Sequence, residues 1–389
     1  MEKYKLSELI VIKNGRDHKD LPNGDYPVFG SGGVMRYVNS YLYDKPSVLL
    51  PRKGSLSNIQ YSDTPFWTVD TLYYTEINEE LVSPYYLYRY LRLLDMSRLD
   101  SGTGVPSMTF DSYYNINVFL PNIEEQRRVA SILQKLDAKI ALNRQINDNL
   151  EAMAKQLYDY WFVQFDFPNE KGKPYKSSGG AMVWNEKLKR EIPQGWHCGT
   201  LLDIAEYTNG LACQKYRPTD NNKLPVIKIK EMHDGLSADT EWVKTDIPDD
   251  VKVFDGDVLF SWSASLEVML WAYGNGGLNQ HIFKVTSKNG YPRSFYFYQL
   301  IHYVGIFKQM AEARKTTMGH ITQDHLKQST IALPPNVDIA NKLEEKLCPI
   351  FDEIVKNNQE IIVLTKQRDE LLPLLMNSQA SINYHLSAC

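Results

Sequence analysis

The sequence predicts an α+β fold made of two copies of one unit, with two long helices that pair as an antiparallel coiled coil. The same landmarks occur twice, in the same order, along the 389 residues. Each series ends in a Leu-Pro junction followed by a long stretch of helical character. In both stretches apolar residues recur about every 3.5 positions, the spacing of a coiled-coil seam.

The landmarks begin near the start of each copy. KLSELIVIKNG (5–15) aligns with TLLDIAEYTNG (200–210) through a shared leucine and a shared Asn-Gly pair, at an offset of 195 residues. TFDSYYNINVFLP (109–121) and TQDHLKQSTIALP (322–334) both run Thr-x-Asp, then nine residues from Asp to Leu, then Pro, at an offset of 213. Because the order is kept while the offset grows, the second copy contains loop insertions.

Within each copy, short runs of β-branched and aromatic residues alternate with turn residues, which is typical of strands. A longer run with apolar residues at helical spacing follows. In the first copy these are the strands YPVFGSGG (26–33), SVLLPRKGS (47–55) and PFWTVDTLYYTEI (65–77), and the helix SPYYLYRYLRLLDMSRL (83–99). In the second they are the strands LPVIKIKEM (224–232) and DVLFSW (257–262), and the helix SFYFYQLIHYVGIFKQMA (294–311).

The first long helix is predicted over 124–162, a stretch without glycine or proline. The second is predicted over 338–377, with a less regular seam, because Pro349 should kink or restart the helix and Pro373 lies near its end. The alternative is a pair of unrelated amphipathic helices, each packed on its own domain.

A polar interruption of the seam favours pairing over that alternative. Asn143 lies at the middle of the first helix, and Asn357 and Asn358 lie at the middle of the second. Because midpoints meet in an antiparallel pair, these asparagines are predicted to face one another and to fix the register at some cost in stability.

Composition indicates a packed globular protein, since 43% of the residues are hydrophobic and no 18-residue apolar run occurs. We therefore expect a cytoplasmic protein. The four cysteines form no CxxC pair, so they are expected to be free thiols. A net charge of −4 excludes a polycation, so any binding to DNA must use local patches and help from a partner.

Catalytic motifs are missing from the sequence. No GxxxxGK[ST] phosphate loop occurs, and FGSGG (29–33) lacks the third glycine of a dinucleotide-binding loop. There is no Asn/Asp-Pro-Pro-aromatic motif, and His320 and His325 do not form an HExxH motif. The chain is therefore expected to be non-catalytic and to bind no metal or cofactor of its own.

The chain divides into six predicted parts. The stretch FDFPNEKGKPYKSSGGAMVWNEKLKREIPQGW (165–196) has the composition of a linker. Its Phe165, Phe167, Trp184 and Trp196 suggest that it is anchored along a surface. The predicted parts are a first mixed domain (1–121), a first helix (122–165), a linker (166–198), a second mixed domain (199–334), a second helix (335–377) and a tail (378–389).

Over essentially its whole length the chain resembles the specificity subunit of type I restriction-modification systems. The resemblance is carried by YPVFGSGG, YLYDKPSVLLPRKGS, VDTLYY, LPNIEEQRRVASIL, the linker FDFPNEKGKPYKSSGG with IPQGW, and QRDELLPLLMNSQ. One departure is the second junction, LPPNVDIANKLEEK (333–346), which lacks the EEQ of the first.

The resemblance implies that the two mixed domains are target-recognition domains, each followed by a conserved-region helix. It further implies that each domain reads one half of an asymmetric, bipartite DNA target, with an unread spacer that the helices set. The implied partners are double-stranded DNA, two methyltransferase subunits that dock on the helices, and motor-nuclease subunits. S-adenosylmethionine, ATP and Mg are expected on those partners, in a complex that methylates DNA and defends against foreign DNA.

Direct base readout requires side chains with paired donors and acceptors on loops that can enter a groove. The candidates in the first domain are Arg16, His18, Lys19, Ser31, Arg36, Arg52, Lys53, Ser55 and Thr103. Those in the second are Gln214, Lys215, Tyr216, Arg217, Ser261, Trp262, Ser263, Lys315, Thr316 and His320. The alternative for any single one of them is a solvated surface residue, and phosphate contacts should outnumber base contacts.

Two other functions are compatible with parts of the sequence. One is a free-standing DNA methyltransferase or nuclease, against which the missing motifs argue. The other is a coiled-coil scaffold without DNA specificity.

Overall fold

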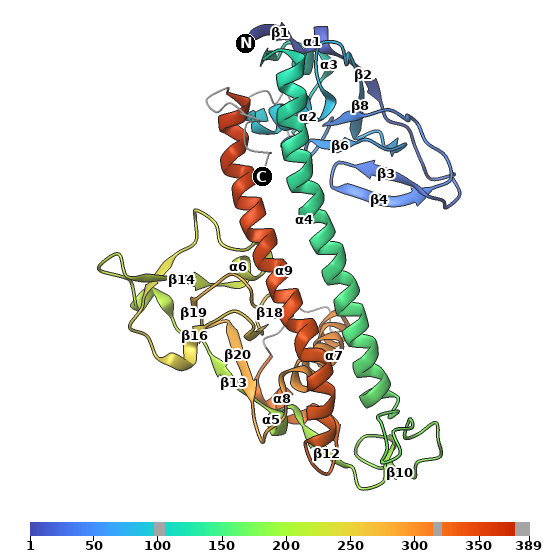
Figure 1. Ribbon diagram of the computed structural model, residues 1–389, viewed down its shortest axis with the longest axis vertical. Coiled ribbons are helices and arrows are strands. Elements are labelled where there is room, and N and C mark those ends of the chain that lie inside the picture. The colour runs from blue at the N-terminus through green and yellow to red at the C-terminus, as the bar shows by residue number, and fades with distance from the viewer. Residues whose placement is uncertain (97–105, 314–320, 378–389) are drawn as a thin grey trace, which may run out of the picture. The chain divides into compact units, whose positions relative to one another are not determined.

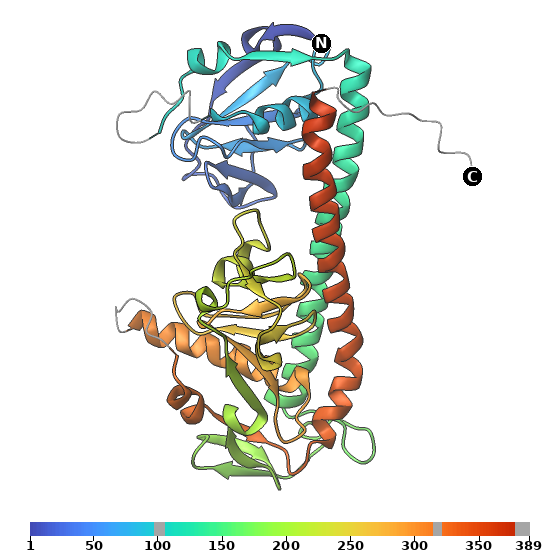
Figure 2. The same cartoon turned by 90° about the vertical axis from the view of Figure 1, so that its left-hand side faces the viewer.

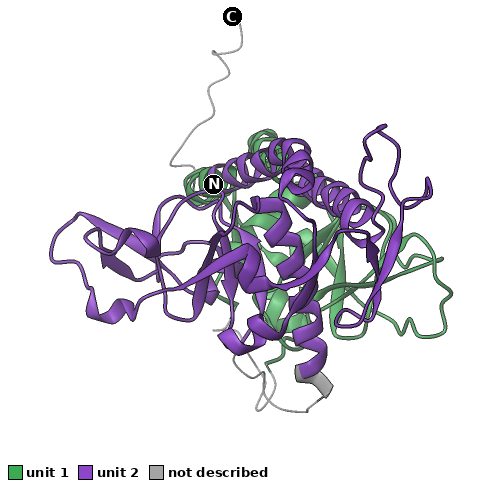
Figure 3. Cartoon of the chain, turned by 90° about the horizontal axis from the view of Figure 1, so that it is seen from below, with its two compact units in different colours: residues 1–140, 364–389 green, residues 141–363 purple. Residues whose placement is uncertain are grey.

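The computed structural model describes residues 1–96, 106–313 and 321–377. It forms two compact units, one of Met1–Ile140 with Leu364–Cys389 (unit 1) and one of Ala141–Val363 (unit 2), coloured separately in Figure 3. Each unit holds a mixed domain of helices and sheets together with segments of two long antiparallel helices (Figure 1). The predicted α+β class, with two repeated domains and a helical pair, is confirmed.

Unit 1 is built around a four-stranded sheet of order β2-β8-β5-β6, with a smaller sheet β4-β3-β7 and a strand pair β1-β9. Its elements are β1 (Glu2–Lys5), α1 (Leu6–Leu9), β2 (Ile10–Asn14), β3 (Tyr26–Gly30), β4 (Gly33–Val38), β5 (Ser47–Pro51), β6 (Gln60–Ser62), β7 (Trp67–Thr68), β8 (Leu72–Ile77), α2 (Pro84–Leu93), α3 (Phe110–Tyr114), β9 (Asn117–Leu120) and the start of α4 (Ile123–Tyr158).

Unit 2 repeats this plan with a sheet β13-β20-β17-β18, a second sheet β15-β14-β19-β16 and a strand pair β12-β21. A hairpin β10-β11 lies in the predicted linker. Its elements are the end of α4, a π-helix (Asp159–Val163), β10 (Met182–Asn185), β11 (Arg190–Pro193), β12 (His197–Thr200), α5 (Leu201–Ile204), β13 (Ala205–Asn209), a 3₁₀ turn (Cys213–Lys215), β14 (Lys223–Ile227), α6 (Ile229–Asp234), β15 (Trp242–Lys244), a 3₁₀ turn (Asp249–Val251), β16 (Lys252–Val253), β17 (Val258–Ser261), β18 (Glu267–Leu270), β19 (Gly276–Leu278), β20 (Ile282–Ser287), α7 (Arg293–Ala313), α8 (Gln323–Gln328), β21 (Thr330–Leu333) and α9 (Asp338–Met376), which ends in unit 1.

Strand register shows the repeat residue by residue. Asn14 pairs with Tyr73 in unit 1, and Asn209 pairs with Phe283 in unit 2. The glycine after each asparagine is required by the same crowding: a Cβ at Gly15 would lie 2.0 Å from the carbonyl oxygen of Val69, and one at Gly210 would lie 2.2 Å from that of Asn279. The repeated Asn-Gly pair therefore marks a place where two backbones touch.

The repeated Leu-Pro junction has the same structure in both copies. After Thr109, α3 makes one turn and β9 then pairs antiparallel with the first strand, β1. After Thr322, α8 does the same and β21 pairs with β12. The junction thus closes each domain next to its own starting strand and leads into a long helix.

The two long helices run in opposite directions and lie side by side in each unit (Figures 1 and 2). In unit 1, Nη1 of Arg368 lies 3.0 Å from Oδ1 of Asp137, and in unit 2, Nδ2 of Asn357 donates to Oδ1 of Asn147 at 3.0 Å. As residue numbers rise along α4 they fall along α9, so the pair is antiparallel.

The prediction that Pro349 restarts the second helix is wrong, because α9 is helical from Asp338 to Met376. Pro349 is exposed, as is Glu345 one turn earlier. The carbonyl that loses its N–H partner to the proline therefore lies on the solvent side of the helix, where water can satisfy it.

The predicted pairing of the asparagines also needs correction. Asn143 is fully buried, but its Nδ2 donates to Oε2 of Glu360 at 2.7 Å rather than to an asparagine. Asn357 and Asn358 both contact Asn147, and Nδ2 of Asn147 donates to Oδ1 of Asn358 at 2.8 Å. Asn143 and Asn357 occupy equivalent places in the two copies of the repeat. In an antiparallel pair, equivalent residues face each other only at the point where the two helices cross their shared twofold axis, and neither asparagine lies at that point.

This corrected pairing predicts a double-mutant result. Asn147→Leu alone should lower the free energy of unfolding by about 1–3 kcal/mol, because it leaves the buried amide of Asn357 without its partner. Asn147→Leu combined with Asn357→Leu should recover most of this loss, since an apolar seam needs no partner. Urea denaturation of the four variants of the cycle measures the coupling, and a double variant no more stable than the single one would contradict the pairing.

None of the helices in the described part of the chain has both the length and the apolar character needed to span a bilayer. Cys198, Cys213 and Cys348 are free thiols, and Cys389 lies outside the described residues.

Candidate nucleic-acid interface

In unit 1 three loop segments surround a hollow of ≈ 610 Å³. They are the loop after β2, the turn between β3 and β4, and the connection between β7 and β8. Among the predicted residues, His18, Lys19 and Ser31 line this hollow. The structure therefore brings together candidates that lie on two separate loops of the sequence.

The loop after β2 is fixed by its neighbours. The backbone N–H of Arg16 donates to the carbonyl oxygen of Thr68 at 2.8 Å, and Nε1 of Trp67 donates to the carbonyl oxygen of Arg16 at 2.9 Å. The N–H groups of His18 and Lys19 donate to Oδ1 of Asp17 at 2.7 and 3.1 Å. These backbone hydrogen bonds, that from Lys19 first, lower the pKa of Asp17. The side chains of Arg16 and Lys19 remain exposed.

The β3–β4 turn is held from β6 and the loop before it. Nδ2 of Asn58 donates to the carbonyl oxygen of Ser31 at 2.6 Å, and Nε2 of Gln60 donates to that of Gly30 at 2.8 Å. Arg36 lies nearby in β4, where its Nη2 donates to the carbonyl oxygen of Leu21 at 2.7 Å and to Oδ1 of Asn23 at 3.0 Å. In this structure Arg36 therefore positions the loop after β2.

A third segment follows β5. The N–H of Arg52 donates to the carbonyl oxygen of Thr71 at 2.9 Å, and its Nη1 donates to that of Asp70 at 3.3 Å. Lys53 and Ser55 are exposed on either side of Gly54, which has a φ of 93°. The predicted residues of this turn thus lie against the β7–β8 connection that lines the hollow. Thr103 lies outside the described residues.

The corresponding loops of unit 2 carry different side chains. Gln214, Lys215 and Arg217 are exposed around the 3₁₀ turn, and Tyr216 is half-buried with Nζ of Lys244 5.6 Å from its ring centre. Trp262 is half-buried, where its Nε1 donates to Oδ1 of Asn209 at 3.1 Å. Lys315, Thr316 and His320 lie outside the described residues.

The structure does not place Ser261, one of the predicted DNA-binding residues, at a surface. Ser261 is fully buried at the end of β17, where its hydroxyl hydrogen-bonds the carbonyl oxygen of Ser265 and accepts the N–H of Glu267 at 3.0 Å. It holds the β17–β18 turn closed. Ser263 is only 8% exposed, so its side chain offers little surface to a ligand. Ala264 in this turn has a φ of 58° and takes the place of Gly54 in unit 1.

No sequence motif marks the residues between β7 and β8 in unit 1 or those between β19 and β20 in unit 2, and they were not predicted. In unit 1, Asp70 and Thr71 follow β7, which pairs in parallel with β3. In unit 2, Gln280 and His281 follow β19, which pairs in the same way with β14. The aromatic ring of His281 lies 5.7 Å from that of Trp262. Aligning the two copies through their Asn-Gly pairs and strands would have placed VDT and NQH at this shared position.

The two loop clusters differ in hydrogen-bonding chemistry. The loops of unit 1 carry the guanidinium groups of Arg16 and Arg52 and the carboxylate of Asp70, whereas those of unit 2 carry the amide of Gln280 and the indole of Trp262. An arginine fork suits guanine, a carboxylate suits the cytosine amino group, and an amide suits adenine. The same frame therefore carries two different sets of hydrogen-bonding groups on its loops.

Comparison with known proteins gives consistent matches. A family model described as the type I restriction modification DNA specificity domain matches residues 1–152 and 193–367. The specificity subunit of the type I restriction enzyme MjaIX from Methanocaldococcus jannaschii is 24% identical over 378 residues, covering 92% of this chain and 84% of that protein. The specificity subunit of HindI from Haemophilus influenzae is also 24% identical, covering 78% of this chain and 79% of that protein. The crystal structure of a type I S subunit from M. genitalium has the same fold, with a TM-score of 0.64 at 15% identity over 98% of this chain and 96% of that one.

Proposed function

Because this chain belongs to the family of type I restriction-modification DNA specificity proteins, we propose that each of its two domains reads one half of an asymmetric, bipartite DNA target. Proteins of this family are the non-catalytic DNA-recognition subunits of a restriction-modification complex, in which they assemble with other subunits.

The observation that carries the proposal is one backbone frame bearing two different sets of loop side chains. Asp70 follows β7 at the place where Gln280 follows β19, and Arg52 follows β5 where Trp262 follows β17. A shared strand order with different donors and acceptors on its loops is the arrangement expected for reading two different short sequences. Two identical half-sites would need no such difference.

The paired helices then have two tasks in the proposal. They set the unread spacer between the half-sites, and they present docking surfaces to two methyltransferase subunits, one for each copy of the repeat. S-adenosylmethionine would be bound by those subunits, which would also flip the target base out of the duplex. ATP and Mg would be bound by motor-nuclease subunits where these are present.

Loop variants test the division of reading. Arg52→Ala should relax or change base preference in one half of the target only, with a loss of about 1–3 kcal/mol of discrimination if the guanidinium contacts a base. Gln280→Ala should act on the other half only. The measurement is a survey of methylated sites made by the complex of each variant with its methyltransferase partners.

Lys45 offers a matched control, because it is exposed and precedes the start of β5, whereas Arg52 follows the end of that strand. Lys45→Ala should leave both half-sites unchanged. If Arg52→Ala altered both halves equally, the domains would not read separately. Methyl transfer by the purified chain alone would instead indicate a free-standing methyltransferase, and a wild-type complex without site preference would indicate a scaffold.

A further inference from the structure

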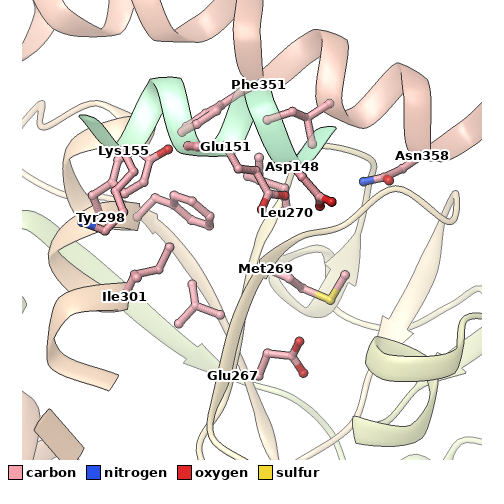
Figure 4. A pocket seen from close by; sticks show the side chains of 14 residues that line it. Asp148, Glu151, Lys155, Glu267, Met269, Leu270, Tyr298, Ile301, Phe351 and Asn358 are labelled. Carbon is pink, nitrogen blue, oxygen red and sulfur yellow. The ribbon is translucent and has the colours of Figure 1, made fainter. Parts of the chain in front are cut away.

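A cavity of ≈ 560 Å³ lies in unit 2 where α4, β18, α7 and α9 meet (Figure 4). One part of its wall is apolar and aromatic. The residues of this part are Val268, Met269, Leu270, Phe297, Tyr298, Ile301, Phe351 and Ile354. The other part carries carboxylates from two elements, with Asp148 and Glu151 on α4 and Glu267 on β18.

The charges around this cavity are unbalanced. Lys155 is the cation among its lining residues, and its Nζ is already bound to Asp159, the first residue of the π-helix that follows α4. Glu267 has a histidine neighbour, His233, whose Nδ1 lies 3.1 Å from Oε2. Burial, and secondarily the charge of Asp148, raise the pKa of Glu151. The cavity therefore favours a positive group that also has an apolar stem.

Unit 1 shows how the same place is filled in the other copy. There the carboxylate of Asp137 on α4 pairs with Arg89 from α2 and with Arg368 from α9. The guanidinium carbon of Arg89 lies 5.3 Å from the ring centre of Tyr85 and 5.1 Å from that of Tyr88, and both rings contact Tyr61. An arginine that the chain itself supplies thus occupies a site walled by aromatic rings and closed by a carboxylate.

The two places correspond in the repeat. Tyr61 is opposite Val48 in the β5–β6 pair, as Leu270 is opposite Val258 in the β17–β18 pair. Asp137 comes three residues before the buried seam residue Ile140, as Phe351 comes three residues before the buried seam residue Ile354. In unit 2 the aromatic wall is kept, Phe351 takes the place of Asp137, and the carboxylates at the edge come from other positions. Neither Arg89 nor Arg368 has a counterpart among the residues that line the cavity, and Arg293, whose guanidinium lies over the ring of Phe351, is paired with Asp352.

We propose that this cavity is a docking site for an arginine side chain presented by a methyltransferase subunit, at one of the two docking positions. The inference rests on the proposed function, since it assigns an occupant to one of the surfaces expected there. The arginine would lay its stem along Met269 and Ile301 and direct its guanidinium to Asp148 and Glu151, where a charged pair is only partly hydrated. The two docking positions would then differ, because unit 1 already contains its own arginine.

Stepwise binding of the methyltransferase subunit to the full-length chain tests the proposal. Native mass spectrometry of a titration should show two binding steps for the wild type. Asp148→Asn combined with Glu151→Gln should weaken one step at least about tenfold and leave the other unchanged. As whole residues both are exposed on α4, although the cavity partly desolvates the carboxyl group of Glu151, so these substitutions should not unfold the chain. Glu345→Gln, an exposed change on α9 outside the cavity lining, is the matched control and should affect neither step.

A second variant fills the cavity from within. Met269→Arg supplies the guanidinium in cis, as Arg89 does in unit 1, and should weaken the same step, whereas Met269→Leu should not. Normal binding by both Met269→Arg and the α4 double variant would overturn the docking site while leaving the proposed function intact. If no methyltransferase bound the wild-type chain, the proposed function would fail too. Self-association of the chain that is lost in these variants would instead identify a second copy as the occupant and overturn the proposal.

Discussion

Inserting one heptad after Ile140 in α4 and one before Leu364 in α9 is expected to lengthen the spacer of the DNA target, or to weaken binding sharply. Seven residues keep the 3.5-residue seam in phase and add about 10 Å to each helix. At about 3.4 Å per base pair this corresponds to roughly 3 bp. Three base pairs also rotate one half-site relative to the other by about 100° around a duplex of 10–10.5 bp per turn.

These insertion points follow from the observed register. Contacts of Asp137 with Arg368 and of Asn147 with Asn357 place Ile140 opposite Leu364, so facing insertions preserve both contacts. Neither set of recognition loops is altered, so the bases preferred in each half-site should remain the same. A survey of methylated sites reads both quantities. Changed bases with the original spacing would refute the proposal that domains read and helices measure.

Asp137→Ala is expected to destabilise unit 1 strongly, by about 3–5 kcal/mol. The carboxylate accepts a hydrogen bond from the hydroxyl of Tyr85 and pairs with Arg89 and Arg368. The Arg89 side chain is only 6% exposed, so removal of the carboxylate leaves a buried charge without its partner. The midpoint of urea denaturation should fall accordingly.

Two further variants separate this explanation from a general loss of packing. Asp369→Ala removes an exposed partner of Arg368 on the same helix and should cost less than about 1 kcal/mol. Asp137→Leu combined with Arg89→Met should recover much of the lost stability, because an apolar pair needs no compensating charge. Equal losses in Asp137→Ala and in that double variant would show that shape, not charge, matters there.

The sequence predicted the frame well because the frame is repeated and strongly patterned. The Asn-Gly pairs, the Leu-Pro junctions and the seam are local signals, and each survived in the structure. The predicted helix at 294–311 corresponds to α7, Arg293–Ala313, and the one at 83–99 begins where α2 does, at Pro84. Such features depend on residues near one another in the chain.

The misses depend on contacts between distant residues. EKYK (2–5) and HCGT (197–200) form strands although neither has a strand pattern, because each gains its order from pairing with a strand more than 100 residues away. Ser261 looked like a loop residue, but a turn closing onto its hydroxyl buries it. Asn147 was passed over because the position of the axis between two helices is not encoded in either helix alone. Asp70 and Gln280 belong to no sequence motif, and only their equivalent positions in the two folded domains identify them as candidates.

The composition of unit 1 has a consequence for synthesis on the ribosome. Its hydrophobic core contains Leu372, Leu375 and Met376 from the end of α9, and the hydroxyl of Tyr86 donates to the carbonyl oxygen of Met376 at 3.4 Å. The N-terminal domain is therefore translated first but completed last. At translation rates of about 5–20 residues per second, its apolar face waits for its final helix for roughly 10–50 s. A chain released early would keep that face uncovered, so only a finished polypeptide can present a sealed first domain to its partners.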